Sequence, residues 1–164
     1  MARTVDTNFT KRKLEKWLEG LTKPRKQLDG LPVCPYLKHY RDRIHLARNK
    51  DPERLARHFA EVKDIFKFEA CVVFGFWMSW NKMEKMVDTL NKDLKKKDVC
   101  CFMMHPDGDE DVLPVEYPFD IPVLIVQKIS TLEKAKKQLS KTNYYKHYKS
   151  VSYTHLRAHE TRYH

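Results

Sequence analysis

Residues 70–104 read ACVVFGFWMSWNKMEKMVDTLNKDLKKKDVCCFMM, and the order of apolar and charged segments in this stretch decides the fold. The continuous apolar runs at its two ends, Ala70–Phe76 and Val99–Met104, are typical of buried strands. Between them, after Ser79 as a capping residue, apolar residues recur at steps of three and four: Trp80, Met83, Val87, Leu90 and Leu94. This pattern predicts two buried strands joined by an amphipathic helix.

Two further helices and a short strand are expected on the N-terminal side of this stretch. The first helix is expected over residues 10–21, capped by Thr10. Asp51 and Pro52 predict the start of a second helix. The Asp side chain can accept hydrogen bonds from the first amides of the helix, and the N–H that Pro lacks is not needed at the first helical position. The apolar face predicted for this helix contains Leu55, Phe59, Val62 and Ile65 or Phe66. Residues 43–49 alternate apolar and polar side chains, which indicates a short strand between the two helices.

On the C-terminal side, one more strand and one more helix are expected. Residues 121–128 are apolar and rich in β-branched side chains, which favours a strand, although Pro122 also suits the first turn of a helix. Ser130 and Glu133 have the spacing of a capping box, so a helix is expected to begin there and run towards Thr142. Together these elements predict an α/β (α+β) sandwich, a small mixed sheet of three to four strands covered by three to four helices.

A single globular domain is expected over residues 10–149, after a flexible N-terminus over residues 1–9. Residues 150–164 are expected to be an artefact, because Val151–Thr161 back-translates into the transposase adapter used in short-read sequencing. Such a segment is excluded from fold reasoning. We therefore expect the natural sequence to break off near Lys149, and we expect a metagenomic shotgun assembly as its source.

The composition indicates a basic, folded protein. The chain has 164 residues, and its 32 Lys and Arg against 22 Asp and Glu give a formal net charge of +10. With 41% hydrophobic and 33% charged residues, it is too apolar for a disordered tail and too charged for a membrane span. The positive charge favours nucleic acid, anionic lipid or acidic small molecules as ligands, but no membrane partner is expected. The alternative is that lysines such as those in 95–97 and 134–137 only solvate helix surfaces.

The cysteines indicate a reduced compartment. The chain contains Cys34, Cys71, Cys100 and Cys101, with no Cys-x-x-Cys pair, so neither a zinc ribbon nor a thioredoxin-type site is indicated. The N-terminus is polar and has no apolar run typical of a secretory leader, so a cytoplasmic location is expected. Cys71 and Cys101 lie in the apolar runs, where a free cysteine packs as a small hydrophobe.

The segment 105–111 reads HPDGDED and directly follows the second buried strand. Ligands of open α/β sheets bind outside the carboxyl ends of strands, so His105 and Asp107 are candidate catalytic or metal-binding residues. A divalent metal is the candidate cofactor, because histidine and carboxylates are common metal ligands. An EF-hand is excluded because Val112 stands where that loop needs glycine. The alternative is a solvated acidic turn with Asp107 and Gly108 at its corner.

Cys34 is the second candidate, because it lies in a loop between Pro32 and Pro35. Basic neighbours such as Lys38 and His39 would favour its thiolate, and it would then act as a nucleophile or a metal ligand. The alternative is a packed and inert thiol beneath the first helix.

The aromatic residues between the first buried strand and the following helix have two possible roles. They are Phe74, Phe76, Trp77 and Trp80. They can form a stacking platform, or they can close the core where strand meets helix. Because they continue the apolar spacing, the core role is favoured.

Four short motifs occur in a fixed order across roughly residues 10–140. They are Trp17, Gly30-Leu31-Pro32-Val33-Cys34-Pro35-Tyr36, Met104-His105-Pro106-Asp107, and Tyr117-Pro118-Phe119-Asp120-Ile121-Pro122 leading to Ser130–Ala135. This order resembles a bacterial family, the domain-of-unknown-function family numbered fourteen-fifteen, although the spacer between Cys34 and His105 is shorter than in that family. The family has no established activity, so the resemblance implies no reaction. It does single out three residues as candidate functional positions: Cys34, His105 and Asp107. It also implies a helix start at the Pro-rich run.

Two functions are expected from these observations. The first is a small metal-binding or thiol-dependent enzyme whose site gathers Cys34, His105 and Asp107, with Glu116 as a further metal ligand. The second is a non-catalytic basic accessory domain that binds nucleic acid or a protein partner. The first is favoured because the residue pattern and the resemblance meet at the same positions. A third interpretation is that the Cys-Pro and His-Pro segments are only structural corners.

Overall fold

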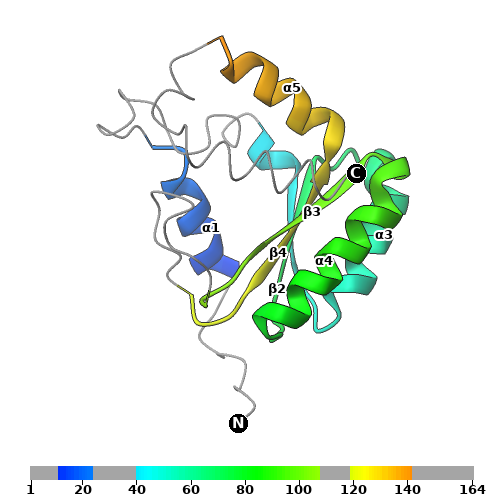
Figure 1. Cartoon of the computed structure of the whole chain (residues 1–164). Helices are drawn as coiled ribbons and strands as arrows, with labels where there is room; N and C mark the ends of the chain where they lie inside the picture. Colours follow the sequence, from blue (N-terminus) through cyan, green and yellow to red (C-terminus); the bar gives the residue numbers. More distant parts are fainter. Residues whose placement is uncertain (1–10, 24–39, 108–118, 142–164) are drawn as a thin grey trace.

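The computed structural model describes residues 11–23, 40–107 and 119–141 (Figure 1). In chain order its elements are α1 (Lys11–Gly20), η2 (Arg41–Arg43), β1 (Ile44–Arg48), α3 (Pro52–Phe66), β2 (Ala70–Phe74), α4 (Trp80–Leu94), η3 (Lys95–Lys97), β3 (Val99–Met104), β4 (Val123–Lys128) and α5 (Ile129–Leu139). Four strands in one mixed sheet and four α-helices within these residues confirm the predicted fold class. No helix in the described part of the chain is both long and apolar enough to span a membrane.

The sheet has the strand order β1-β2-β4-β3. β1 pairs in parallel with β2, and β4 pairs antiparallel with both β2 and β3. β1, β2 and β3 therefore run in the same direction, and their carboxyl ends meet at one edge of the sheet. We call this edge the carboxyl edge. The helices α3 and α4 form the connections between these three strands, as parallel pairing requires.

Helices cover both faces of the sheet (Figure 1). α3 and α4 lie on one face, where their apolar side chains pack against the strands in a core that includes Phe59, Met83, Val87, Leu90, Cys71, Val73, Cys101 and Val126. α1 lies on the opposite face in a smaller cluster that includes Leu14, Leu18, Leu46, Val72, Phe74, Ile121 and Val123. Both faces of the central strands are therefore buried, which explains their continuous apolar sequence.

Most of the predicted elements are confirmed. Asp51 accepts a hydrogen bond from the Arg54 N–H (3.1 Å) and begins α3, and Ser79 accepts one from the Lys82 N–H (3.3 Å) and begins α4. The strand predicted over 121–128 is present as β4, so the helix that the resemblance implied there is wrong. Thr10, the predicted cap of the first helix, lies outside the described residues.

The predicted apolar face of α3 is partly wrong. Ile65 and Phe66 are 74% and 61% exposed, whereas Phe59 is buried as predicted. The helix face that meets the sheet also contains Ala56 and Ala60, which the apolar pattern did not single out. Their small side chains let the helix approach the strands closely, so the buried face is rotated away from the larger residues of the last turn.

The predicted capping box is also wrong. α5 begins at Ile129, before Ser130, and no side chain of its N-cap residue Lys128 caps it. Asp98, just before β3, takes this role: its side chain accepts hydrogen bonds from the Ser130 N–H (2.9 Å) and the Ser130 hydroxyl, and its carbonyl accepts one from the Ile129 N–H (2.9 Å). The carboxylate and the main-chain carbonyl of Asp98 thus satisfy the first two amides of α5.

Candidate functional site

His105 follows β3 at the carboxyl edge and is buried. Its Nε2 lies 2.8 Å from the Met78 carbonyl oxygen, and its Nδ1 accepts a hydrogen bond from the Asp107 N–H at 3.0 Å. A carbonyl only accepts and an amide N–H only donates, so the ring carries its proton on Nε2 and a lone pair on Nδ1. The side chain therefore ties the end of β3 to the segment that enters α4.

Two tryptophans pack around this imidazole. The Trp77 ring lies 5.2 Å from the His105 ring at an angle of 56°, and the Trp80 ring lies 5.7 Å away, edge to face at 85°. Phe74 and Phe76 are buried, as expected for residues that close the core. Trp80 is 37% exposed, so it forms part of the molecular surface beside the carboxyl edge.

Of the four candidate metal or catalytic residues, the structure places two close together. The Asp107 carboxylate is about half exposed, and its Oδ2 lies 3.9 Å from Nδ1 of His105. Cys34 and Glu116 lie outside the described residues. Within residues 11–23, 40–107 and 119–141, no three His, Cys, Asp or Glu side chains are grouped closely enough to hold a metal. Metal binding through Nδ1 requires the Asp107 N–H to turn away from the ring.

The cysteines within the described residues are buried and carry no disulfide. Burial raises the pKa of the Cys71 thiol to about 12 and the pKa of the Cys101 thiol well above its ordinary value. Neither side chain can supply a thiolate near neutral pH, since the neutral form is strongly favoured. The prediction that Cys71 and Cys101 pack as small hydrophobes is confirmed.

The solvent side of α4 carries a row of lysines. Its buried residues, Met83, Met86, Val87, Leu90, Asn91 and Leu94, all face the sheet. On the opposite side, helical spacing aligns three exposed lysines of α4 with a fourth in η3, and we call these four residues the α4 lysine row: Lys82, Lys85, Lys92 and Lys96. None of these four ammonium groups has a carboxylate partner within the residues that the structure describes.

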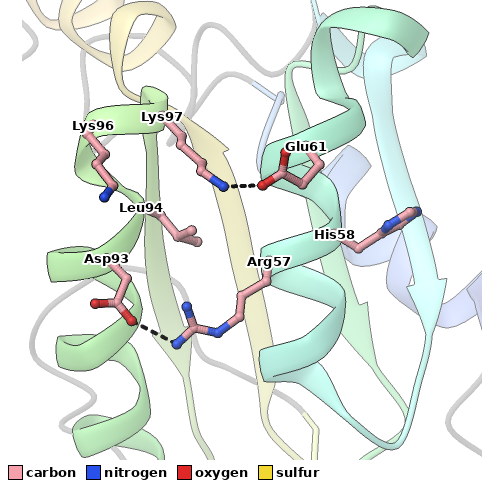
Figure 2. Close-up of a pocket in the computed structure, with 7 residues that line it drawn as sticks. All are labelled: Arg57, His58, Glu61, Asp93, Leu94, Lys96 and Lys97. Atoms are coloured by element: carbon pink, nitrogen blue, oxygen red, sulfur yellow. Dashed lines mark hydrogen bonds and ion pairs between the residues drawn. The ribbon is translucent and has the colours of Figure 1, made fainter.

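An open groove of about 480 Å³ lies between α3 and the C-terminal end of α4 (Figure 2). Two ion pairs cross it: Arg57 Nη2 lies 2.9 Å from Asp93 Oδ2, and the Lys97 ammonium contacts the Glu61 carboxylate. Arg57 also pairs with Glu53 on its own helix (3.1 Å). The charges lining the groove therefore mainly bind one another and join the two helices.

Lys96 is different, because it lines this groove without a carboxylate partner among the described residues. Figure 2 shows it on the α4 side, beyond the Lys97–Glu61 pair. The α4 lysine row thus extends from the first turn of α4 to the rim of the groove.

The α4 lysine row was not singled out from the sequence, although the signal is present. The apolar period that predicts the helix also places all four lysines on the side opposite its apolar residues. The hydrogen bonds of His105 have no such signal, because its partner Met78 lies 27 positions earlier in the chain.

Comparisons with family models, with curated proteins and with solved structures gave no match to this chain. The family resemblance therefore stays a prediction.

Proposed function

We propose that the protein binds nucleic acid non-catalytically, through contacts of the α4 lysine row with the phosphate backbone. The observation that carries this proposal is the alignment of three exposed lysines on the solvent face of α4 with a fourth in η3, with no carboxylate partner among the described residues. A single lysine–phosphate contact contributes little binding free energy. A row of lysines contributes more, because several condensed counterions are released when it binds the phosphate backbone.

The dimensions of the row suit a nucleic-acid backbone. Lys82 and Lys96 are 14 positions apart, so the row is about 21 Å long at the helical rise of about 1.5 Å per residue. This length corresponds to about six base-pair steps of duplex DNA at about 3.4 Å each. The net charge of +10 supports the proposal, because it attracts polyanions over a longer range than any single contact.

The test is fluorescence anisotropy with labelled 20-nucleotide single strands and duplexes, measured over a series of salt concentrations. The variant is Lys85→Glu/Lys92→Glu, which reverses two charges in the middle of the row. The matched control is Lys134→Glu/Lys137→Glu on α5, which changes the net charge equally at two exposed positions. The urea midpoints of all three proteins establish that the variants remain folded.

We expect the logarithm of the wild-type binding constant to fall with the logarithm of the salt concentration, with a slope of about −3 to −4 on duplex DNA. Lys85→Glu/Lys92→Glu should weaken binding at least about tenfold and reduce this slope by about 2, because two phosphate contacts are lost. The control should change affinity by less than about threefold. Equal loss in both variants would show that net charge alone attracts the nucleic acid and would overturn the proposal.

A second candidate function is supported by a different observation, the 3.9 Å approach of Asp107 Oδ2 to His105 Nδ1 at the carboxyl edge. Together with Cys34, which the family resemblance implies, these groups would form a metal-binding or thiol-dependent site. The test is elemental analysis of the full chain purified without a chelating tag, compared with Cys34→Ala and Asp107→Ala. Stoichiometric metal that is lost in both variants supports this function, and absence of metal from the wild-type protein contradicts its metal-binding form.

A further inference from the structure

Trp80 is an exposed aromatic residue at the start of α4. It is 37% exposed, whereas Phe74 and Phe76, which precede it in the chain, are buried. Among the described residues, the apolar cluster on the α1 side includes Trp77, but neither cluster includes Trp80. A single exposed apolar residue is common at protein surfaces, so the role of Trp80 has to be argued from its surroundings.

The imidazole of His105 packs against the Trp80 ring. The two rings lie 5.7 Å apart at an angle of 85°. The His105 side chain is fully buried, and its ring nitrogens are bound to the Met78 carbonyl and the Asp107 N–H. Because Met78 is two residues before Trp80, the imidazole is bonded to the same segment of chain that it supports. The indole is therefore positioned before any ligand binds, which lowers the entropic cost of binding.

The indole lies close to the end of the α4 lysine row. Trp80 is two positions before Lys82, the first lysine of the row, and Ser79 and Asn81 beside it are exposed as well. Side chains of an α-helix lean towards its N-terminus, so Trp80 points past the first turn towards the carboxyl edge, where it contacts His105. A phosphate backbone that follows the row towards the start of α4 arrives at this turn.

The helical geometry distinguishes a single strand from a duplex. Positions 80 and 82 point to different sides of α4, since successive residues are about 100° apart around the axis. A strand bound to the row must therefore bend over the exposed first turn to bring a base to the indole. A duplex resists such a bend, because its persistence length is about 150 base pairs, and its bases are paired and stacked inside. A flexible single strand can make the bend and present an unpaired base.

The charges near Trp80 favour an uncharged ring over a phosphate. Glu84 follows Trp80 by four positions, which places it on the same side of α4. The Asp107 carboxylate lies 3.9 Å from Nδ1 of His105, the imidazole that supports the indole. Carboxylates repel a phosphate, but a nucleobase carries no net charge, and the amino groups of bases donate hydrogen bonds to carboxylates.

We propose that Trp80 stacks on an unpaired base of a single strand whose phosphate backbone is bound by the α4 lysine row. The inference rests on the proposed nucleic-acid binding and names single-stranded nucleic acid as the ligand class. Every base has a π-face, so the stacking requires no particular sequence. A basic surface combined with an aromatic side chain is the usual means by which proteins bind single strands.

The test is fluorescence anisotropy with the full chain and three labelled probes at one salt concentration. The probes are a 20-nucleotide single strand of mixed sequence, a fully abasic strand of the same length, and the blunt duplex. The abasic strand keeps the phosphates and lacks the bases. The variants are Trp80→Leu, which keeps an apolar contact with His105, and Trp80→Phe, which keeps an aromatic ring. The matched control is Phe66→Leu on α3, since Phe66 is 61% exposed.

We expect the wild-type protein to bind the single strand at least about fivefold more tightly than the abasic strand, because one stacked base contributes at least this much. Trp80→Leu should bind the two strands alike, Trp80→Phe should keep part of the preference, and Phe66→Leu should keep all of it. The affinity for the blunt duplex should change less than about twofold in Trp80→Leu. The urea midpoints of all variants establish that they remain folded.

The outcomes separate this inference from the proposed function. If the wild type binds the single and abasic strands equally well, stacking is overturned while phosphate binding by the lysine row stands. If no probe binds, both are overturned. An equal loss for all three probes in Trp80→Leu would overturn stacking, because Trp80 would then act on the backbone contacts. A preference for the single strand that persists in Trp80→Leu would place the base contact elsewhere and would also overturn it.

Discussion

Asn91 is the buried polar residue whose hydrogen bonds have the clearest structural role. Its amide nitrogen donates to the Cys101 carbonyl (3.2 Å), and its side-chain oxygen accepts from the Cys101 N–H (2.7 Å). Cys101 lies in the middle of β3, which is an edge strand. The side chain thus replaces a neighbouring strand and satisfies main-chain groups that a sheet edge leaves open.

We expect Asn91→Leu to lower the free energy of unfolding by about 2–4 kcal/mol, because two buried main-chain groups lose their partners at about 1–3 kcal/mol each, offset in part by the better helix propensity of leucine. Urea denaturation measures the change. Asn81→Leu, at an exposed position of the same helix, should change stability by less than about 0.5 kcal/mol. An unchanged midpoint for Asn91→Leu would show that water replaces the lost hydrogen bonds.

The thiols of the sheet give a second prediction at the scale of single residues. Since burial raises the pKa of Cys71 to about 12, its thiolate fraction at pH 8 should be about a thousandfold below that of an ordinary cysteine. Iodoacetamide should therefore leave Cys71 and Cys101 unmodified in the native protein and alkylate both in urea, as followed by peptide mass spectrometry. Rapid alkylation of either thiol under native conditions would mean that the sheet opens locally.

At the scale of elements, α3 and α4 are joined by ion pairs that should respond to pH. The hydrogen bond from the Lys97 ammonium, together with its charge, lowers the pKa of Glu61 below its ordinary value. The folded pKa is thus lower than the unfolded one. The stabilisation is fully present above the unfolded pKa, about 4.5, and is lost as the pH falls through the folded value.

We therefore expect Lys97→Met to return the Glu61 pKa towards its ordinary value in an NMR titration. The stabilities of wild type and variant should differ at pH 7 and converge at acidic pH, once Glu61 is protonated in both the folded and unfolded states. Lys96→Met is the matched control, because Lys96 lines the same groove without a carboxylate partner among the described residues. An equal effect of both variants on the Glu61 pKa would indicate a general field of the lysines rather than this pair.

The elements themselves were predictable because each has a local signal. The strands β2 and β3 are continuous apolar runs, and α4 has a clear helical period and a serine cap. Their pairing had no such signal: β4 lies between β2 and β3, an order set by contacts between distant segments. The start of α5 was misassigned for the same reason, since its capping carboxylate, Asp98, lies 32 positions before Ser130.

The candidate site was predictable only in part. The position of His105 and Asp107 at the end of a strand followed from the apolar run before them, and the structure places them together. The hydrogen bonds that occupy both ring nitrogens depend on the Met78 carbonyl and on the turn at Asp107, which a residue pattern does not encode. The place of these two residues at the end of a strand could be predicted from sequence, but their bonding partners could not.

At the scale of the whole molecule, the proposed nucleic-acid contacts gather on α4 and at the sheet edge where this helix begins. The α4 lysine row is on the solvent side of α4, and Trp80 is at its first turn beside the carboxyl edge. The proposed lysine contacts are with charged phosphates, whereas the proposed Trp80 contact is with an uncharged base. The net charge of +10 attracts any polyanion and is screened by salt.

We expect salt to distinguish these two kinds of contact, as measured by anisotropy titrations of the single strand at about 0.1 M and about 0.3 M salt. The ratio of the wild-type affinity to that of Lys85→Glu/Lys92→Glu should shrink about fivefold between these concentrations, because two phosphate contacts, each about 0.7 in slope, are lost. The ratio of the wild-type affinity to that of Trp80→Leu should change less than about twofold, since stacking on an uncharged base is not screened. If both ratios shrink alike, Trp80 acts through the phosphate contacts of the lysine row. In that case the base has no site of its own at the carboxyl edge.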